Sequence, residues 1–252
     1  MKVLFIGDVF GTRGMEALNK YLLEIKNEYK PNLIFLNGEN IDKGFGISEK
    51  IYKELMVMGI NAVTLGNHSF SKRELIDFID ESNIIRPANY SDSVPGRGYI
   101  TVKYNDKLVT VINLMGRIFM GDPLDNPFKR VDEILEEVNS DFIFVDMHAE
   151  ATSEKIAMAH YLDGRVTAVV GTHTHVPTAD AMVFPNKTMY ITDIGMTGAK
   201  YGILGADKDI IISKFLTGMP QRIKESLSTK LQFNAVIMDT VLNKIKSINI
   251  YE

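Results

Sequence analysis

The chain of 252 residues contains no cysteine and carries a formal net charge of −4. Without cysteine, disulfides and thiolate-bound metal or iron–sulfur centres are excluded. The acidic balance provides no general attraction to nucleic acid or to an anionic membrane. No apolar run approaches the length of about 18 residues that a membrane span requires, and no signal peptide precedes the first apolar segment. We therefore expect one α/β domain over residues 1–252 in a cytoplasmic protein.

The N-terminal third of the chain alternates between strand and helix patterns. Short apolar or β-branched runs that end in polar turns predict strands over residues 2–6, 33–36 and 62–65. Apolar positions at helical spacing predict helices over 18–25, 49–58 and 75–79. We expect Gly59 to cap the second helix, and Ser71 with Glu74 to form a capping box for the third. This order predicts right-handed crossovers and a largely parallel sheet.

The middle of the chain changes character. Residues 99–104 and 108–114 predict a hairpin that extends the same sheet. Asn126 as N-cap and Pro127 at the first helical position predict a helix to about Val138. The remaining elements are predicted as strands over 142–145, 166–170, 189–191, 231–238 and 241–250, and a helix over 153–162. The long connection 113–125 is predicted to form a lid or a subunit contact.

Residue types that bind metals follow several of these strands directly. They are Asp8, Glu39 with Asn40, Asn67 with His68, His148, and His173 with His175. Ligands of open α/β sheets bind outside the carboxyl ends of the strands, where the loops converge. Each residue alone also has a structural explanation as a helix cap, a turn residue or a buried histidine. Their joint recurrence at strand ends favours a metal site.

The motifs resemble those of a known family. Gly7-Asp8, Gly38-Glu39-Asn40, Gly66-Asn67-His68, His148 and Gly171 to His175 resemble, in order, the GDxH, GDxxD, GNH-acid, H and GHxH motifs of the calcineurin-like metallophosphoesterases. The GEN motif and Phe10, which replaces the first histidine, resemble the YmdB-like phosphodiesterase branch. The resemblance extends through residues 190–196. It implies the calcineurin-like metallophosphoesterase fold, an α/β fold in which a β-sandwich of mixed sheets is flanked by helices in four layers, α/β/β/α.

The resemblance also implies a site with two divalent ions bridged by Glu39. One ion is expected to be held by Asp8, Glu39, Asn40 and His175, and the other by Glu39, Asn67, His148 and His173. Asn40 would replace the missing histidine ligand, and His68 would serve as proton donor. Ser69 follows His68 where an acidic residue is usual, so the group that orients the His68 ring stays open. Oxygen and nitrogen ligands without sulfur admit iron, manganese or zinc.

The function implied by the resemblance is hydrolysis of small 2′,3′-cyclic nucleotides by a metal-dependent phosphodiesterase. A hydroxide bridging the two ions would attack phosphorus, and His68 would protonate the leaving group. A phosphomonoesterase or RNase remains an alternative, as does a regulatory protein that binds a nucleotide or a partner with little turnover. Expected partners are a small phosphodiester, an RNA-derived substrate and further copies of the chain in a dimer or tetramer. The sequence identifies no substrate-binding residue.

Overall fold

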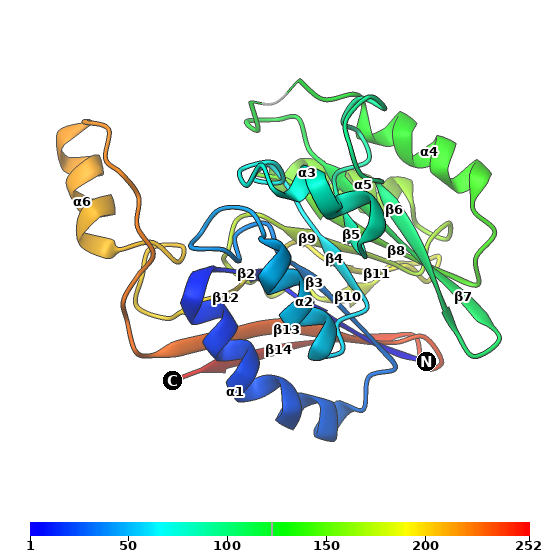
Figure 1. Cartoon of the computed structure of the whole chain (residues 1–252). Helices are drawn as coiled ribbons and strands as arrows, with labels where there is room; N and C mark the ends of the chain where they lie inside the picture. Colours follow the sequence, from blue (N-terminus) through cyan, green and yellow to red (C-terminus); the bar gives the residue numbers. More distant parts are fainter. Residues whose placement is uncertain (122) are drawn as a thin grey trace.

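The computed structural model describes residues 1–121 and 123–252. Within these residues the strands form an eight-stranded and a six-stranded sheet (Figure 1). The first sheet has the order β2-β12-β13-β1-β3-β4-β5, with β14 also paired to β13. The second sheet has the order β10-β11-β9-β8-β7-β6.

The N-terminal strands of the first sheet are parallel, as the sequence predicts. β1 (Lys2–Ile6), β3 (Leu33–Asn37), β4 (Ala62–Thr64) and β5 (Ile84–Ile85) pair side by side in the same direction. The helical connections are α1 (Gly11–Tyr29), α2 (Glu49–Val57) and α3 (Leu75–Phe78) with the 3₁₀ turn η1 (Ile79–Glu81). The sheet is completed by β2 (Asp8–Val9), β12 (Met196–Ala199), β13 (Leu231–Asp239) and β14 (Lys244–Tyr251).

The predicted hairpin forms, but it does not extend the first sheet. β6 (Tyr99–Tyr104) and β7 (Lys107–Met115) are antiparallel, and β7 pairs in parallel with β8 (Phe142–His148). The hairpin therefore lies at the edge of the second sheet, a choice that depends on the long-range pairing with β8. That sheet also contains β9 (Ala168–Thr172), β10 (Met182–Val183) and β11 (Met189–Ile191), and its helices are α4 (Pro127–Glu137) and α5 (Thr152–Tyr161).

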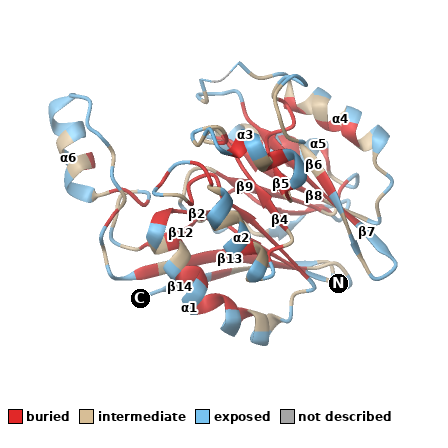
Figure 2. Cartoon of the chain, viewed as in Figure 1, coloured by how far each residue is buried: buried red, intermediate tan, exposed pale blue. Residues whose placement is uncertain are grey.

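The alternation of side chains along the strands builds the layers. In β1, Val3 and Phe5 belong to a buried cluster shared with the second sheet, whereas Leu4 and Ile6 belong to a cluster shared with α1. On the far face of the second sheet, strand residues such as Val145 pack with side chains of α4 and α5. Figure 2 shows these strands buried and the outer faces of the helices exposed. The order of layers is α/β/β/α, as predicted.

Local predictions near the helix ends differ in outcome. The Asn126 side chain accepts a hydrogen bond from the backbone N–H of Phe128, which confirms the predicted cap of α4. The predicted capping box is wrong, because α3 is a single turn whose N-cap residue, Glu74, makes no capping bond through its side chain. Backbone bonds between residues three apart, such as the N–H of Ile76 to the carbonyl of Arg73, already satisfy the donors there.

One further helix, α6 (Lys208–Thr217), has no counterpart in the sequence predictions. Figure 1 shows it standing away from the sheets, joined to the body by the chain on either side. The predicted lid or subunit contact at 113–125 includes residue 122, which lies outside the described residues. Among the helices that the structure describes, none combines the length and apolar character that crossing a bilayer demands.

Candidate metal centre

The residues selected by their position after strands converge on one rim of the sandwich. Asp8 begins β2 directly after β1, Glu39 and Asn40 follow β3, and Asn67 and His68 follow β4. From the second sheet, His148 ends β8, and His173 and His175 follow β9. The contacts described below connect all eight side chains, so the structure brings together every site residue that the sequence singles out.

Glu39 and His148 form the centre of the cluster. The Nε2 atom of His148 lies 3.3 Å from the Oε1 atom of Glu39, 3.1 Å from Nδ1 of His173 and 3.0 Å from Oδ1 of Asn67. Ligand atoms of Glu39, His148 and His173 all lie within 4.8 Å of one another. Such spacing allows one cation to contact all of them.

A second group of side chains adjoins the first through Glu39. The Nδ2 atom of Asn40 donates a hydrogen bond of 2.9 Å to Oε1 of Glu39 and lies 3.3 Å from Nε2 of His175. That nitrogen of His175 lies 3.8 Å from Oδ1 of Asp8. Glu39 is thus the shared member of both groups, and its Oε1 atom makes the contact to each.

Hydrogen bonds on the far side of two rings determine which nitrogen faces the cluster. The Thr172 hydroxyl donates to Asp146, 2.7 Å away, and therefore accepts from Nδ1–H of His148 at 2.8 Å. Likewise Nδ1 of His175 lies 2.9 Å from the carbonyl oxygen of Leu204, to which it donates. Both rings consequently present the Nε2 lone pair to the cluster, the tautomer that a metal ligand requires.

The backbone of the loop after β9 is held in an unusual shape. His173 and His175 have φ values of 100° and 64°, in the left-handed region that side chains other than glycine rarely adopt. The Asp193 carboxylate holds the loop, because its Oδ2 accepts from both the backbone N–H and the hydroxyl of Thr174. Lys155, fully buried in α5, donates to the same oxygen at 2.7 Å.

Glycine is required on the rim at position 66. A Cβ atom there would lie 2.2 Å from Nε2 of His148 and 2.5 Å from Oε2 of Glu39. Both distances are far below van der Waals contact, so a larger residue would displace the cluster.

Burial and mutual interactions shift the pKa values of the three most deeply buried members of the cluster that titrate, Asp8, Glu39 and His148. Burial raises the pKa of Asp8 to about 6, against the opposing effect of His175. Burial also acts to raise the pKa of Glu39, but His148 and His68 outweigh it and lower that pKa to about 2. Burial acts to lower the pKa of His148, but the Glu39 and Asp8 carboxylates outweigh it and raise that pKa to about 9.

Two observations indicate that the donor set fits divalent metal ions. The Oδ1 atom of Asp8 is buried and has no hydrogen-bond partner among the described residues. The Nε2 lone pair of His148 faces two acceptors, Oδ1 of Asn67 and Oε1 of Glu39. Without a cation these acceptors would repel one another, which is why the carboxylates favour a proton on Nε2 of His148. A divalent ion would take the place of that proton and would also satisfy Oδ1 of Asp8. Oxygen and imidazole donors suit iron, manganese or zinc.

His68 lies beside the cluster rather than within it. Its backbone N–H donates to Oε2 of Glu39 at 2.9 Å, and its ring packs edge-on against Phe45, with the ring centroids 5.1 Å apart. Ser69 is buried and its hydroxyl bonds the carbonyl oxygen of Gly66, so Ser69 does not orient the ring. The contacts found at the ring are Phe45 and Nδ2 of Asn67, 3.3 Å from Nε2 of His68.

A cavity of about 370 Å³ opens beside His68. Its polar side contains Glu39, Asn40, His68, His173 and His175, and its apolar wall includes Phe10, Phe45, Ile203, Leu204, Ile211, Phe215 and Ile223. Ile211 and Phe215 are four residues apart in α6, so they lie on the same face of that helix. Asp207 caps α6 by accepting from the backbone N–H groups of Asp209 and Ile210.

Several residues that shape the site carry no signal in the sequence predictions. Thr172, Asp146, Lys155 and Glu150 act on the histidines through contacts between distant segments; Glu150, for example, lies 3.0 Å from Nε2 of His173. Asp193 belongs to the stretch that carries the family resemblance, but its role appears only in the structure. A polar residue inside an apolar strand, such as Asp146 in β8, was the available clue.

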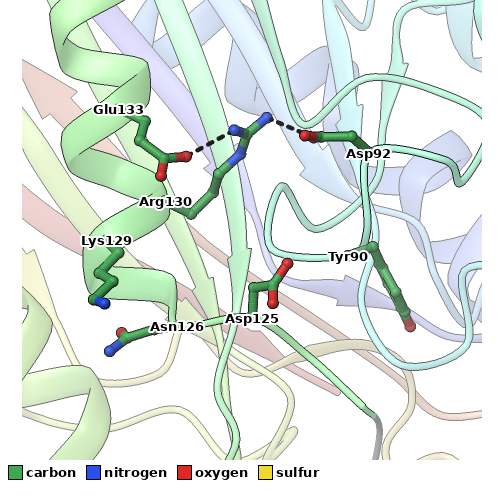
Figure 3. A pocket seen from close by; sticks show the side chains of 7 residues that line it. All are labelled: Tyr90, Asp92, Asp125, Asn126, Lys129, Arg130 and Glu133. Atoms are coloured by element: carbon green, nitrogen blue, oxygen red, sulfur yellow. Dashed lines mark hydrogen bonds and ion pairs between the residues drawn. The ribbon is translucent and has the colours of Figure 1, made fainter.

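A different cavity, of about 400 Å³, lies beside the start of α4 (Figure 3). Its central cation is already neutralised, because Arg130 pairs with Glu133 at 2.9 Å and with Asp92 at 3.1 Å. It contains none of the predicted metal ligands. We therefore assign the chemistry to the rim around Glu39.

Comparison with known proteins agrees with this geometry. A family model described as YmdB-like protein matches residues 4–252. The chain belongs to the YmdB-like family. The family resemblance read from the motifs is thereby confirmed, and so is the metallophosphoesterase type of fold.

Relatives of this YmdB-like chain include an enzyme and solved structures. It is 48% identical over 242 residues to the 2′,3′-cyclic-nucleotide 2′-phosphodiesterase of Bacillus subtilis, covering 95% of this chain and 91% of the relative. A protein from Thermus thermophilus has 41% identity and a TM-score of 0.95, with 100% of both chains covered. A novel phosphatase from Mycoplasma pneumoniae has 34% identity and a TM-score of 0.92, with 100% of this chain and 94% of that one covered.

Proposed function

We propose that the protein is a metal-dependent phosphodiesterase that hydrolyses small 2′,3′-cyclic nucleotides. The observation that carries the proposal is the buried cluster around Glu39, in which Oδ1 of Asp8 lacks a partner and the His148 lone pair faces two acceptors. The substrate follows from the similarity to the Bacillus subtilis enzyme. We also propose that the chain folds as a single domain, because residues of both sheets share one buried cluster.

Two divalent ions would be held by the two groups of side chains that share Glu39, of which Glu39, His148 and His173 already lie within reach of one cation. One group consists of Asp8, Glu39, Asn40 and His175, and the other of Glu39, Asn67, His148 and His173. When bound, such ions supply nucleophilic water near neutral pH and neutralise the charge of the phosphoryl oxygens. These side chains would hold the ions, and Thr172 and Leu204 fix the orientation of the imidazoles of His148 and His175 that would bind them.

His68 supplies the proton that the leaving oxygen needs. His68 lies next to Glu39 and lines the cavity, so its ring is close to a phosphate held at the cluster. Imidazole is a common general acid, and it can give a proton to an alkoxide leaving group. Phe45 and Asn67 orient the ring in the absence of an acidic residue at position 69.

The experiment compares turnover of 2′,3′-cyclic AMP by the metal-loaded protein before and after chelation, with metal content measured in each sample. Chelation and Glu39→Gln should each remove activity, because chelation removes the divalent ions and the substitution removes the carboxylate that both ions would share. His68→Ala should lower kcat by about 10²- to 10⁴-fold while the metal content stays at the wild-type level.

The metal measurement separates loss of chemistry from loss of the site. Turnover that continues in protein shown to be metal-free would overturn the proposal. Hydrolysis of nitrophenyl phosphate alone, with no activity on its bis-ester or on the cyclic nucleotide, would instead indicate a phosphomonoesterase.

A further inference from the structure

A second hollow adjoins the cavity beside His68, which we call the catalytic cavity. It has a volume of about 390 Å³ and is lined by Asp42, Lys43, Phe45, Lys72, Arg222 and Ile223. Phe45 and Ile223 also line the catalytic cavity, so the two hollows are neighbours separated by these apolar side chains. We call the second hollow the basic pocket.

The basic pocket holds positive charge that no neighbouring carboxylate neutralises. Asp42 is paired with Lys72 at 3.2 Å. Lys43 and Arg222 have no ion pair with any residue that the structure describes. The pocket at α4 is the opposite case, since the guanidinium of Arg130 is held between two carboxylates (Figure 3). A bound anion would therefore meet two uncompensated cations in the basic pocket.

The turn that carries Lys43 is tied to the catalytic residues. Lys43 has φ 55°, in the left-handed region, and Gly44 and Gly46 have φ values of 91° and 71°. The N–H of Gly44 donates to the carbonyl oxygen of Asn40, and that of Gly46 to the carbonyl oxygen of Glu39. Lys43 of the basic pocket and two of the proposed metal ligands, Glu39 and Asn40, are thus parts of one short, internally bonded loop. The left-handed backbone at Lys43 is of the kind found at binding sites.

The catalytic cavity lacks this charge. No Lys or Arg is among its lining residues, and most of its lining outside the cluster is aromatic or aliphatic. A phosphate at the cluster can be neutralised by the metal ions, and a nucleoside can pack on the apolar wall. A further phosphate on the same substrate would find its counter-charge beyond Phe45, at Lys43 and Arg222.

The geometry points to a subsite for a second phosphate in the basic pocket, occupied by the phosphate on the 5′ side of the nucleoside whose 2′,3′-cyclic phosphate is cleaved. This inference rests on the proposed function. It deepens it by extending the substrate class from cyclic mononucleotides to cyclic nucleotides with a 5′-phosphate, whether free or joined to a preceding nucleoside.

The test measures kcat/KM for three substrates on the metal-loaded protein. They are adenosine 2′,3′-cyclic phosphate, the same compound with a 5′-phosphate, and the dinucleotide ApA with a terminal 2′,3′-cyclic phosphate. The substrates with a second phosphate should be preferred by about fivefold at low ionic strength, and the preference should shrink as salt is added. Preference for the dinucleotide alone would identify the end of an RNA chain as the source of the second phosphate.

The variant Lys43→Asn with Arg222→Gln removes both cations, and asparagine tolerates the left-handed backbone at position 43. The ratio of kcat/KM with and without the second phosphate should fall to about one. Using the ratio cancels any general effect of the substitutions. The matched control, Lys50→Gln with Lys103→Gln, removes the same charge from exposed positions outside both cavities and should keep the wild-type ratio.

Equilibrium binding provides a readout independent of turnover. Calorimetry should show tighter binding of adenosine 3′,5′-bisphosphate than of adenosine 3′-phosphate, and the double variant should lose the difference. Equal kcat/KM for all three substrates, or a preference that survives in the double variant, would overturn the subsite. Failure to hydrolyse any of the three would overturn the proposed function itself, so the two failures are distinguishable.

Discussion

At the scale of single residues, the orientation and tautomer of the histidines in the cluster depend on hydrogen-bond partners outside it. Thr172 accepts from Nδ1–H of His148 and donates to Asp146, so one hydroxyl fixes the ring that faces Glu39. Asp146 is fully buried, and its second oxygen, Oδ2, accepts from Thr64 and Asn37. The orientation of His148 is therefore set by a chain of hydrogen bonds that runs from Thr172 through Asp146 into the sheet.

Thr172→Val removes that hydroxyl with little change in volume. We expect metal affinity to fall by about 10- to 100-fold, because His148 loses the bond that fixes its tautomer. Stability should fall by about 1–3 kcal/mol, because Nδ1 of His148 and Oδ1 of Asp146 are left unsatisfied. Competition with a chelator measures the first effect and urea denaturation the second.

Thr101→Val is the control for this substitution. It removes a hydroxyl from a Thr101–Thr110 pair in the β6–β7 hairpin, away from the cluster. Its metal affinity should equal that of the wild type. Wild-type metal affinity in Thr172→Val would show that Thr172 does not orient His148.

At the scale of elements, α5 holds the loop that follows β9. Lys155 of α5 and Asp193, which follows β11, are both fully buried and form an ion pair of 2.7 Å. The same carboxylate accepts from Thr174, and its other oxygen accepts from the N–H of Gly195. The buried Asp193 carboxylate therefore fixes the loop that carries His173 and His175. It does so by joining α5 to the segment after β11, two parts of the chain that are far apart in the sequence.

Lys155→Met should destabilise the protein by about 3–5 kcal/mol, because it leaves the Asp193 carboxylate buried without its counter-charge. Adding Asp193→Asn should recover part of the loss, since an amide costs less to bury than an unpaired carboxylate. Chemical denaturation of the single and double variants measures both values. A loss below about 1 kcal/mol in Lys155→Met, typical of an exposed pair, would contradict this account.

At the scale of the whole molecule, the first sheet and α1 are joined through Glu252. Its Oε1 accepts from the Tyr21 hydroxyl at 2.7 Å and pairs with Lys20, and its Oε2 accepts from the N–H of Leu231 at 3.0 Å. The hydrogen bonds from Lys20 and Tyr21 lower the pKa of Glu252 to about 2. This contact stabilises the folded state only while the carboxylate is ionised.

The stability that Glu252 contributes should therefore depend on pH. A carboxylate whose pKa is lower in the folded state contributes fully above its unfolded value, 4.5, and loses the contribution as pH falls towards 2. Glu252→Gln should lower the melting temperature at pH 7 and have a smaller effect at pH 3. An equal effect at both pH values would show that ionisation of Glu252 does not contribute.

The sequence alone determined the parts of the protein that depend on short stretches of chain. Apolar runs mark most strands, Asn126 marks the start of α4, and the residues after the strands mark the candidate site. The common rim follows from the order of strands and helices, because parallel strands end at the same edge. The motifs around Asp8, Glu39 and His148 identify the family from the sequence, because each motif lies within a few consecutive residues.

Tertiary structure alone decided the features that arise from contacts between distant segments. The pairing of β7 with β8, not any property of residues 99–115, places the hairpin in the second sheet. Helix α6 presents Ile211 and Phe215 to the cavity, although few of its side chains are buried and the helical pattern is correspondingly weak. The bonds of Thr172 and Asp193 join residues that no sequence spacing relates, because packing of the sheets, rather than local preference, sets their distances.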